Sequence, residues 1–247
     1  MTARYDTIGI NYEQLRLPDH RIAAQINHAL GTASTVLNVG AGTGSYEPRD
    51  RQITAVEPSI EMIRKRKRSS APVIQASAEH LPFEDQSFDA AMGILTIHHW
   101  SDKAAGLREI RRVTRGPIVL LTFDPSHRPW LTDYLPELVA LDEGQMPKMS
   151  QYAEWLGSVT IEPVLVPDNC TDGFLYAYWC RPEAYLDERI RSGSSSFWSI
   201  QGLGAGLARL SQDLETGHWD RKYGHLRDQL EYDAGYRLVI GTQLQDS

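Results

Sequence analysis

Three glycines at alternate positions, followed by a glutamate, are the residues of this sequence best suited to binding a ligand. Gly40, Gly42 and Gly44 follow the apolar stretch 36–39, and Glu57 ends the next apolar stretch. A glycine-rich loop lets a ligand approach the backbone, and amides at a helix start can face it. An acid about 20 residues past such a loop can accept both ribose hydroxyls of a nucleoside. The pattern predicts a site for an adenosine-containing ligand.

The spacing of the glycines narrows the choice of ligand. A dinucleotide-binding loop has the form G-x-G-x-x-G, but Ser45 stands where its last glycine would be. An NAD-dependent enzyme is therefore disfavoured. The form present here, G-x-G-x-G, is typical of loops that bind S-adenosylmethionine (SAM).

Strands and helices alternate around these residues, which predicts a parallel sheet covered on both faces. With two later strands, at 159–167 and 236–243, the sequence predicts a Rossmann-like, doubly wound, seven-stranded, mostly parallel α/β sheet. The earlier strands are expected at 34–39, 51–58, 71–77, 87–97 and 116–125, and the helices between them at 19–30, 58–68 and 101–114.

The rest of the chain is expected to form a cap. The 247 residues fit one large domain with an insertion. We expect a core of about 19–125 plus 157–167 and 235–243. A largely helical substrate cap is expected to include about 1–18, 126–156 and 168–234.

Four ordered motifs, VLNVGAGTG, AVEPS, SAEHLPFEDQSFDAAMGILTIHHW and LREIRRV, lie at about residues 34 to 125. Together they resemble a class I SAM-dependent methyltransferase of the type-11 domain family. The resemblance implies SAM as cofactor, S-adenosylhomocysteine (SAH) as product, and methyl transfer as activity.

The resemblance also implies which residues contact the cofactor. The glycine loop would pack against the methionine part, Glu57 would bind the ribose, and an N-terminal lid would close over the site. Arg16 on that lid would pair with the methionine carboxylate in a charge-assisted bond, unless the segment is an ordinary N-terminal helix. The implied contacts are Tyr12, Arg16, Asn38, Gly40, Ala41, Gly42, Gly44, Glu57, Pro58, Met62, Ala78, Glu79, Gly93, Ile94 and His98.

Asn38 departs from the aspartate that is commoner in loops of this kind. Asparagine keeps the hydrogen-bonding shape of aspartate and loses its charge. Glu47 either supplies a carboxylate nearby or lies at the surface. We interpret Asn38 as a conservative change in shape, because the later cofactor motifs are all present.

Methyl transfer from a sulfonium needs little chemistry from the protein, because the leaving group is neutral. Positioning and exclusion of water supply most of the acceleration, and a base is needed only if the acceptor must lose a proton. The candidate bases are His98 and, more weakly, His99 and Glu13. Each histidine has a structural alternative, a hydrogen bond to a neighbouring loop. We expect no metal ion.

The acceptor is expected to be a small, apolar or aromatic molecule. Residues 174–185 are rich in aromatic side chains, which form either a core or an apolar pocket. The net charge of −7 disfavours nucleic acid as a partner, and no apolar run is long enough to cross a membrane. With only Cys170 and Cys180 and no secretory signal, we expect a cytoplasmic monomer or homodimer. The alternatives are a SAM-binding protein without transferase activity and a methyltransferase acting on a macromolecule.

Overall fold

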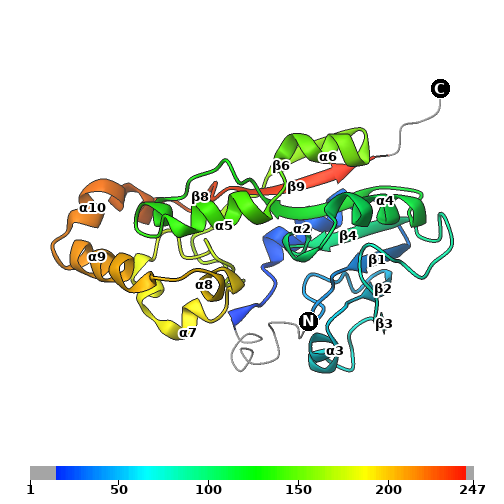
Figure 1. Cartoon of the computed structure of the whole chain (residues 1–247), viewed down its shortest axis with the longest axis horizontal. Helices are drawn as coiled ribbons and strands as arrows, with labels where there is room; N and C mark the ends of the chain where they lie inside the picture. Colours follow the sequence, from blue (N-terminus) through cyan, green and yellow to red (C-terminus); the bar gives the residue numbers. More distant parts are fainter. Residues whose placement is uncertain (1–14, 243–247) are drawn as a thin grey trace.

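A seven-stranded sheet forms the centre of the protein (Figure 1). The computed structural model describes residues 15–242. The sheet order is β3-β2-β1-β4-β5-β9-β6, which confirms the expected α/β class. The strands are β1 (Thr35–Val39), β2 (Gln52–Val56), β3 (Val73–Ile74), β4 (Ala90–Ile94), β5 (Ile118–Phe123), β6 (Val159–Pro163) and β9 (Tyr236–Gly241).

The first five strands are parallel, and β9 runs antiparallel between β5 and β6. β5 is buried along its whole length, as its unbroken apolar sequence predicts. Leu120 pairs with Val239 in the middle of the β5–β9 ladder, and both side chains are buried. The carboxyl ends of β1, β2, β4 and β5 therefore lie at the same edge of the sheet.

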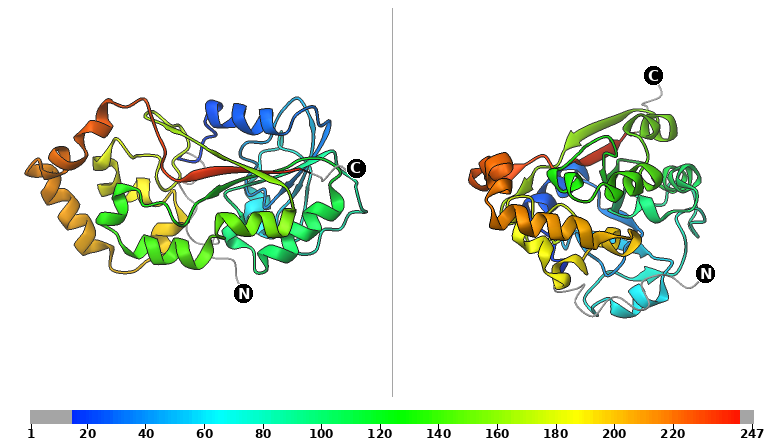
Figure 2. Two further views of the ribbon diagram at one scale, coloured as in Figure 1. Left: turned by 90° about the horizontal axis from the view of Figure 1, so that it is seen from above. Right: turned by 60° about the vertical axis from the view of Figure 1, so that its left-hand side comes forward.

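Helices cover both faces of the sheet. α2 (His20–Ala29) lies on one face, and α4 (Lys103–Val113) and α6 (Met149–Leu156) lie on the other (Figure 2). The expected helix starts are confirmed for α2, α3 (Ile60–Lys65) and α4: Asp19, Ser59 and Asp102 each accept a hydrogen bond from a backbone N–H in the first turn.

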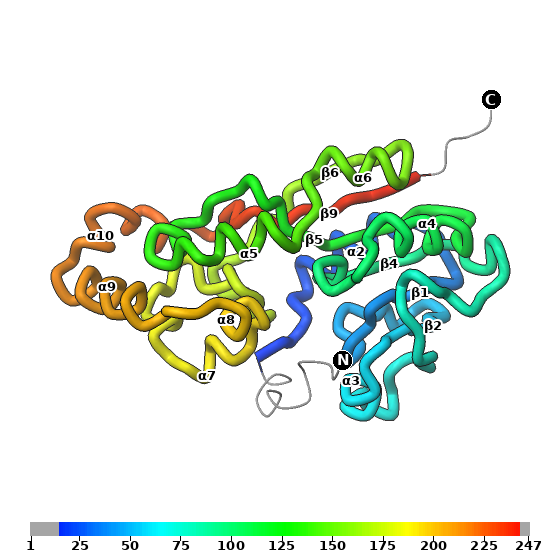
Figure 3. The backbone as a smooth tube through the Cα atoms, viewed as in Figure 1, coloured from blue at the N-terminus to red at the C-terminus, as the bar shows by residue number. Residues whose placement is uncertain are grey.

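The segment between β6 and β9 extends away from the sheet (Figure 3). Within this segment Trp219 is fully buried, and its ring lies edge-on to Trp130, with 5.2 Å between the ring centroids. Helices α9 and α10 lie at the end of the molecule opposite β1 and β2. The elements of this half of the molecule are η3 (Trp130–Asp133), α5 (Glu137–Gln145), β7 (Val166–Pro167), η4 (Pro182–Leu186), α7 (Glu188–Arg191), α8 (Ser195–Ser199), α9 (Leu203–Glu215), α10 (His218–Tyr223), η5 (Gly224–Asp228) and β8 (Glu231–Tyr232).

α6 differs from the expected division into core and cap, which placed 126–156 entirely in the cap. Tyr152 and Leu156 of α6 are buried in the cluster that packs α4 against the sheet. The Tyr152 hydroxyl also lies 2.9 Å from Thr122 Oγ1 on β5. Residues 149–156 therefore pack with the core. The remaining boundaries stay a proposal.

Candidate active site

The glycine loop is tied to the end of the neighbouring strand. The backbone N–H groups of Gly40 and Ala41 both donate to the carbonyl of Val56, at 2.8 and 3.0 Å. Gly40 and Gly42 have φ values of 67° and 51°, in the left-handed region that favours glycine. Gly40 and Gly42 therefore allow the chain to turn sharply after β1 while its backbone stays hydrogen-bonded to the end of β2.

Glu57 connects this loop to the start of α3. One carboxylate oxygen accepts the Gly42 N–H at 2.8 Å, and the other accepts the Ser59 N–H at 2.9 Å. The residue is 7% exposed, and its burial raises the pKa of the carboxyl above its ordinary value. A carboxylate offers about four acceptor positions. The unused positions fit two further donors, such as the vicinal hydroxyls of a ribose.

Asn38 belongs to a buried polar network behind the loop. Its amide Nδ2 donates to Glu47 Oε1 at 3.1 Å, and that same oxygen accepts Arg66 Nη2 at 2.6 Å. The side chains of Arg66 and Glu47 are only 3% and 9% exposed. Glu47 thus does place a carboxylate beside Asn38. Its charge is paired with Arg66, and Glu47 is not among the residues that line the cavity described below.

Replacing Asn38 by aspartate is expected to lower the free energy of unfolding by about 3 kcal/mol, because a second buried carboxylate would face Glu47 with only Arg66 to compensate. Chemical denaturation measures this loss, which should shrink at low pH, where one of the two carboxyls binds a proton. The double variant Asn38→Asp/Glu47→Gln should recover most of it, because the glutamine amide can donate to the new carboxylate. Equal stability of wild type and Asn38→Asp would contradict the network.

A cavity of about 590 Å³ opens at the carboxyl edge of the sheet. Gly44 and Gly93 do not line it; a side chain at Gly44 would face Glu47 and Arg66 instead. Tyr12 and Glu13 lie outside the described residues. The other expected site residues all line the cavity: Arg16, Asn38, Gly40, Ala41, Gly42, Glu57, Pro58, Met62, Ala78, Glu79, Ile94, His98 and His99.

Glu79, at the cavity wall, accepts hydrogen bonds from the loop that precedes α4. Its Oε1 accepts the backbone N–H groups of Ser101 and Asp102, at 2.8 and 3.2 Å, and the Ser101 hydroxyl at 2.9 Å. These hydrogen bonds outweigh partial burial and lower the pKa of Glu79 to about 2. Glu79 is therefore a fixed carboxylate that holds the loop before α4 against the cavity.

His98 and His99 follow β4 in η2 (Ile97–His99), with ring centroids 3.9 Å apart. His98 is the more enclosed ring, and its buried Nδ1 has no hydrogen-bond partner within residues 15–242. Loss of solvation, with the nearby charges of His99, Lys103 and Arg16, lowers the pKa of His98 well below its ordinary value. His98 is therefore neutral at pH 7.

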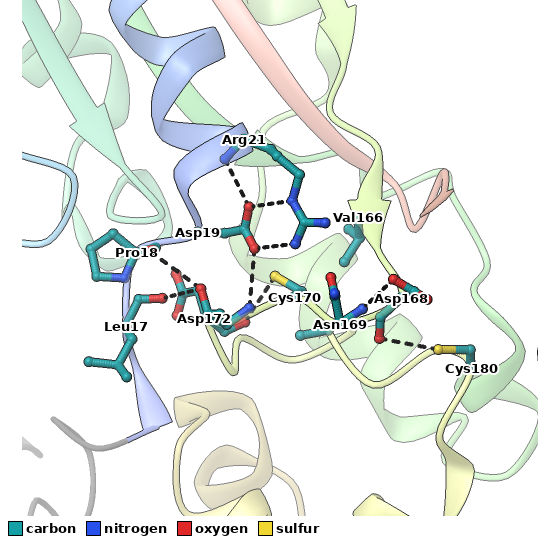
Figure 4. A network of polar contacts seen from close by, with 12 residues as sticks. Leu17, Pro18, Asp19, Arg21, Val166, Asp168, Asn169, Cys170, Asp172 and Cys180 are labelled. Atoms are coloured by element: carbon teal, nitrogen blue, oxygen red, sulfur yellow. Dashed lines mark hydrogen bonds and ion pairs between the residues drawn. The ribbon is translucent and has the colours of Figure 1, made fainter. Parts of the chain in front are cut away.

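Arg16 joins the amino-terminal segment to the cap. Its Nε lies 2.5 Å from Asp172 Oδ1, and Asp172 is 1% exposed. The Tyr46 hydroxyl, from the glycine loop, donates to the other oxygen of Asp172 at 3.0 Å. Nearby, Asp19 Oδ2 accepts the backbone N–H of Thr171 at 3.2 Å. Figure 4 shows Asp19 and Asp172 together with the residues around them. Pairing of Arg16 with the methionine carboxylate remains a proposal and would add to the contact with Asp172.

The aromatic segment 174–185 serves both of the expected roles. Phe174 and Tyr176 line the cavity, whereas Trp179 and Tyr185 are buried in the core of the cap. Several further residues line the cavity besides the expected ones. Tyr46, Thr96 and Trp100 lie within or next to the predicted motifs, whereas the others reach the cavity from distant segments that no local pattern marks. The further lining residues include Tyr46, Thr96, Trp100, Phe123, Asp142, Met146, Tyr236 and Ser194 to Ser196.

The two cysteines are buried free thiols (Figure 4). Cys170 and Cys180 contact the backbone carbonyls of Asp172 and Asp168, and burial raises the pKa of Cys170 to about 12. Among residues 15–242, no three His, Cys, Asp or Glu side chains are grouped to hold a metal ion. The same part of the chain contains no helix long and apolar enough to span a membrane.

Comparisons with known proteins agree with this geometry. The family model described as "Methyltransferase domain" matches residues 37–117. A malonyl-[acyl-carrier protein] O-methyltransferase of Hamiltonella defensa is 36% identical, over 86% of this chain and 81% of that protein. A 2-methyl-6-phytyl-1,4-hydroquinone methyltransferase of Oryza sativa is 25% identical over 66% of this chain. This chain spans about half the length of that plant relative, 53%.

A solved structure extends the similarity to the cap. It is a putative methyltransferase from an antibiotic biosynthesis pathway of Anabaena variabilis, with a TM-score of 0.85 and 36% identity. The alignment covers 94% of this chain and all of that one. The similarity therefore extends over the half of the molecule that contains α5 and α8, which contribute Asp142 and Ser195 to the cavity lining. The chain belongs to the family of SAM-dependent methyltransferases.

Proposed function

We propose that the protein transfers the methyl group of SAM to a small, apolar or aromatic molecule. The observation that carries this proposal is the two-part lining of one cavity. The glycine loop, Glu57 and Glu79 form one part, and the aromatic residues Phe174 and Tyr176 belong to the other. A cavity of about 590 Å³ is within the usual range for small-molecule sites.

The residues at the sheet edge fit the cofactor. Glu57 has acceptor positions left for the ribose hydroxyls, and an added methyl group at Gly42 would meet no described atom within 4 Å. Pro58 and Met62 would flank the adenine, and His98 would lie beside the sulfonium. When bound, SAM supplies an electrophilic methyl group on a positively charged sulfur.

The chain's own contribution is to position the two reactants and to exclude water. The neutral His98 ring adds no positive charge next to the sulfonium, which favours binding of the cation. Ile97 and Trp100, the neighbours of the histidine pair in the chain, are buried, and Trp100 also lines the cavity. Similarity to methyltransferases named for a hydroquinone and for a malonyl-[acyl-carrier protein] supports a small or carrier-bound acceptor.

Calorimetry with SAM and with SAH tests the cofactor assignment, and we expect both to bind. Incubation with methyl-labelled SAM and a metabolite extract should then yield a labelled small molecule. Label recovered in protein or nucleic acid would favour a macromolecular acceptor. Tight SAM binding without any labelled product would favour a SAM-binding protein without transferase activity. Absence of SAM binding would contradict the proposal.

A further inference from the structure

A buried carboxyl group faces the cap side of the cavity. Asp142, on α5, lines the cavity although only 6% of the residue is exposed. The Tyr176 hydroxyl donates to Asp142 Oδ2 at 3.1 Å. Within residues 15–242 no hydrogen bond is made to the second carboxylate oxygen. This oxygen is not among the fully buried side-chain atoms that lack a partner, so it is accessible from the cavity and can accept a hydrogen bond from a donor group of a ligand.

The surroundings of Asp142 are apolar and aromatic. The rings of Phe123 and Tyr176 lie 5.2 Å apart, and those of Phe174 and Tyr236 lie 4.5 Å apart. Met146 and Leu175 add aliphatic surface to the same wall. A molecule in this part of the cavity would therefore meet ring faces on several sides and one carboxylate.

This wall is continuous with the cofactor part of the cavity. Phe123 ends β5, and β5 pairs in parallel with β4, whose last residue Ile94 lines the cavity with His98. The backbone N–H of Leu95 also donates to the carbonyl of Leu121 at 2.9 Å. Tyr176 rests against Phe123 and holds Asp142. A molecule bound by Asp142 therefore occupies the cavity in which the methyl donor is proposed to bind.

We propose that Asp142, positioned by Tyr176, binds an O–H or N–H group of the acceptor and takes its proton during methyl transfer. The acceptor is then an aromatic or apolar molecule with a protic nucleophile, and this inference rests on the proposed function. The acceptor oxygen or nitrogen forms a bond to the methyl carbon as the sulfur–methyl bond breaks. The electron pair of that bond stays on the neutral thioether, and the acceptor proton moves to the carboxylate and then to solvent.

The electrostatics of Asp142 suit this role. Burial raises its pKa to about 6, and the hydrogen bond from Tyr176 and the charge of Arg128 partly oppose that rise. The other titratable groups facing Asp142 are Tyr176 and Tyr236, whose pKa values burial raises well above 10, so both remain protonated. At pH 7 the carboxyl is mostly ionised, and below pH 6 it is mostly protonated. Proton acceptance should therefore fail as the pH falls through about 6.

Binding of matched probes tests the inference without knowledge of the natural acceptor. 2-Naphthol, 2-aminonaphthalene and 2-methoxynaphthalene share one ring system, and the methoxy compound lacks the donor. In the presence of SAH, calorimetry at pH 7.5 should show at least one protic probe binding ten-fold more tightly than the methoxy probe. The naphthol and amine arms distinguish an O–H from an N–H acceptor. Asp142→Asn should reduce this preference at least five-fold, and so should Tyr176→Phe, which frees the carboxylate to move.

Glu137→Gln is the matched control, because Glu137 is an exposed acid on the same helix. It should leave the preference unchanged. Equal binding of protic and methoxy probes by wild type, or failure of all three to bind, overturns the inference, as does an unchanged preference in Asp142→Asn. Thermal unfolding checks that both variants fold, and SAH affinity should stay within two-fold. Failure of methyl transfer with labelled SAM would instead contradict the proposed function, because probe preference does not depend on turnover.

Discussion

Replacing Glu57 by alanine is expected to reduce the affinity for SAM at least ten-fold, or about 1.4 kcal/mol. The change removes the proposed acceptor for the ribose hydroxyls and also releases the Gly42 and Ser59 N–H groups that the carboxylate now holds. Calorimetric titration with SAM and with SAH measures the loss. Glu61→Ala is a suitable control, because Glu61 lies on α3 with its charge paired to Arg64 at the surface. It should bind SAM as wild type does.

Glu57→Gln should also lose affinity, although glutamine has nearly the same shape. Both carboxylate oxygens accept backbone N–H groups. A glutamine amide would therefore point its own N–H₂ at one of these two donors, and the loop would lose a contact. Wild-type SAM affinity in both Glu57 variants would refute the ribose assignment.

The pH dependence offers an independent check on Glu57. Burial raises its pKa, against hydrogen bonds from Ser59 and Gly42 and the charge of Arg66. The folded protein therefore holds this proton more tightly than the unfolded chain does. The contribution of Glu57 to stability is fully present below the unfolded pKa and is lost as the pH rises through the folded pKa. SAM affinity should instead rise as the pH rises through the folded pKa, because ribose binding needs the ionised carboxylate. Glu57→Ala should abolish both trends.

The part of the cavity proposed for the cofactor could be predicted because its residues follow neighbouring strands in one stretch of chain. A parallel sheet brings the ends of β1, β2 and β4 to the same edge, so the positions of Gly40, Glu57 and His98 followed from the order of strands. The starts of the helices near residues 19, 58 and 101 could be predicted for a similar reason, since capping, here by Asp19, Ser59 and Asp102, depends on adjacent residues.

Contacts between distant segments could not be predicted in this way. Arg16 and Asp172 are 156 positions apart, and Tyr176 and Asp142 are 34 apart. α5 has apolar and acidic residues on several sides, so its sequence does not show that Asp142 faces a cavity while Glu143 faces solvent. The aromatic residues of 174–185 were ambiguous because a core and an apolar pocket have the same composition; only packing separates Tyr176 from Tyr185.

From the sequence, Asn38 is interpreted as a conservative change in shape from aspartate. In the structure its amide donates a hydrogen bond, which an ionised aspartate could not do. The partner is Glu47, whose charge is balanced by Arg66 from the end of α3. Because an aspartate at position 38 would compete with Glu47 for that single cation, asparagine is the residue that this network accommodates.

Gly40→Ala and Gly42→Ala are expected to separate the folding of the loop from its binding function. A side chain at Gly40 would collide with Thr96, whose Cβ would lie 2.8 Å from the new methyl group, at a φ of 67°. Left-handed backbone costs an ordinary residue about 1–2 kcal/mol, and overpacking adds a similar amount. We expect the free energy of unfolding to fall by about 3 kcal/mol, measured by chemical denaturation without ligand. SAM affinity should fall as well, because Thr96 lines the cavity.

Gly42→Ala is the matched case, because its φ of 51° imposes a similar backbone cost while the added methyl group meets no described atom within 4 Å. Its unfolding free energy should fall by only about 1 kcal/mol, yet its SAM affinity should fall at least ten-fold, because the methyl group would enter the space proposed for the cofactor. A large loss of stability in Gly42→Ala would mean that its glycine serves folding. Unchanged SAM affinity in that variant would mean that the cofactor does not approach the loop at Gly42. If both results are found, glycine is needed at position 40 for folding and at position 42 for binding of the ligand.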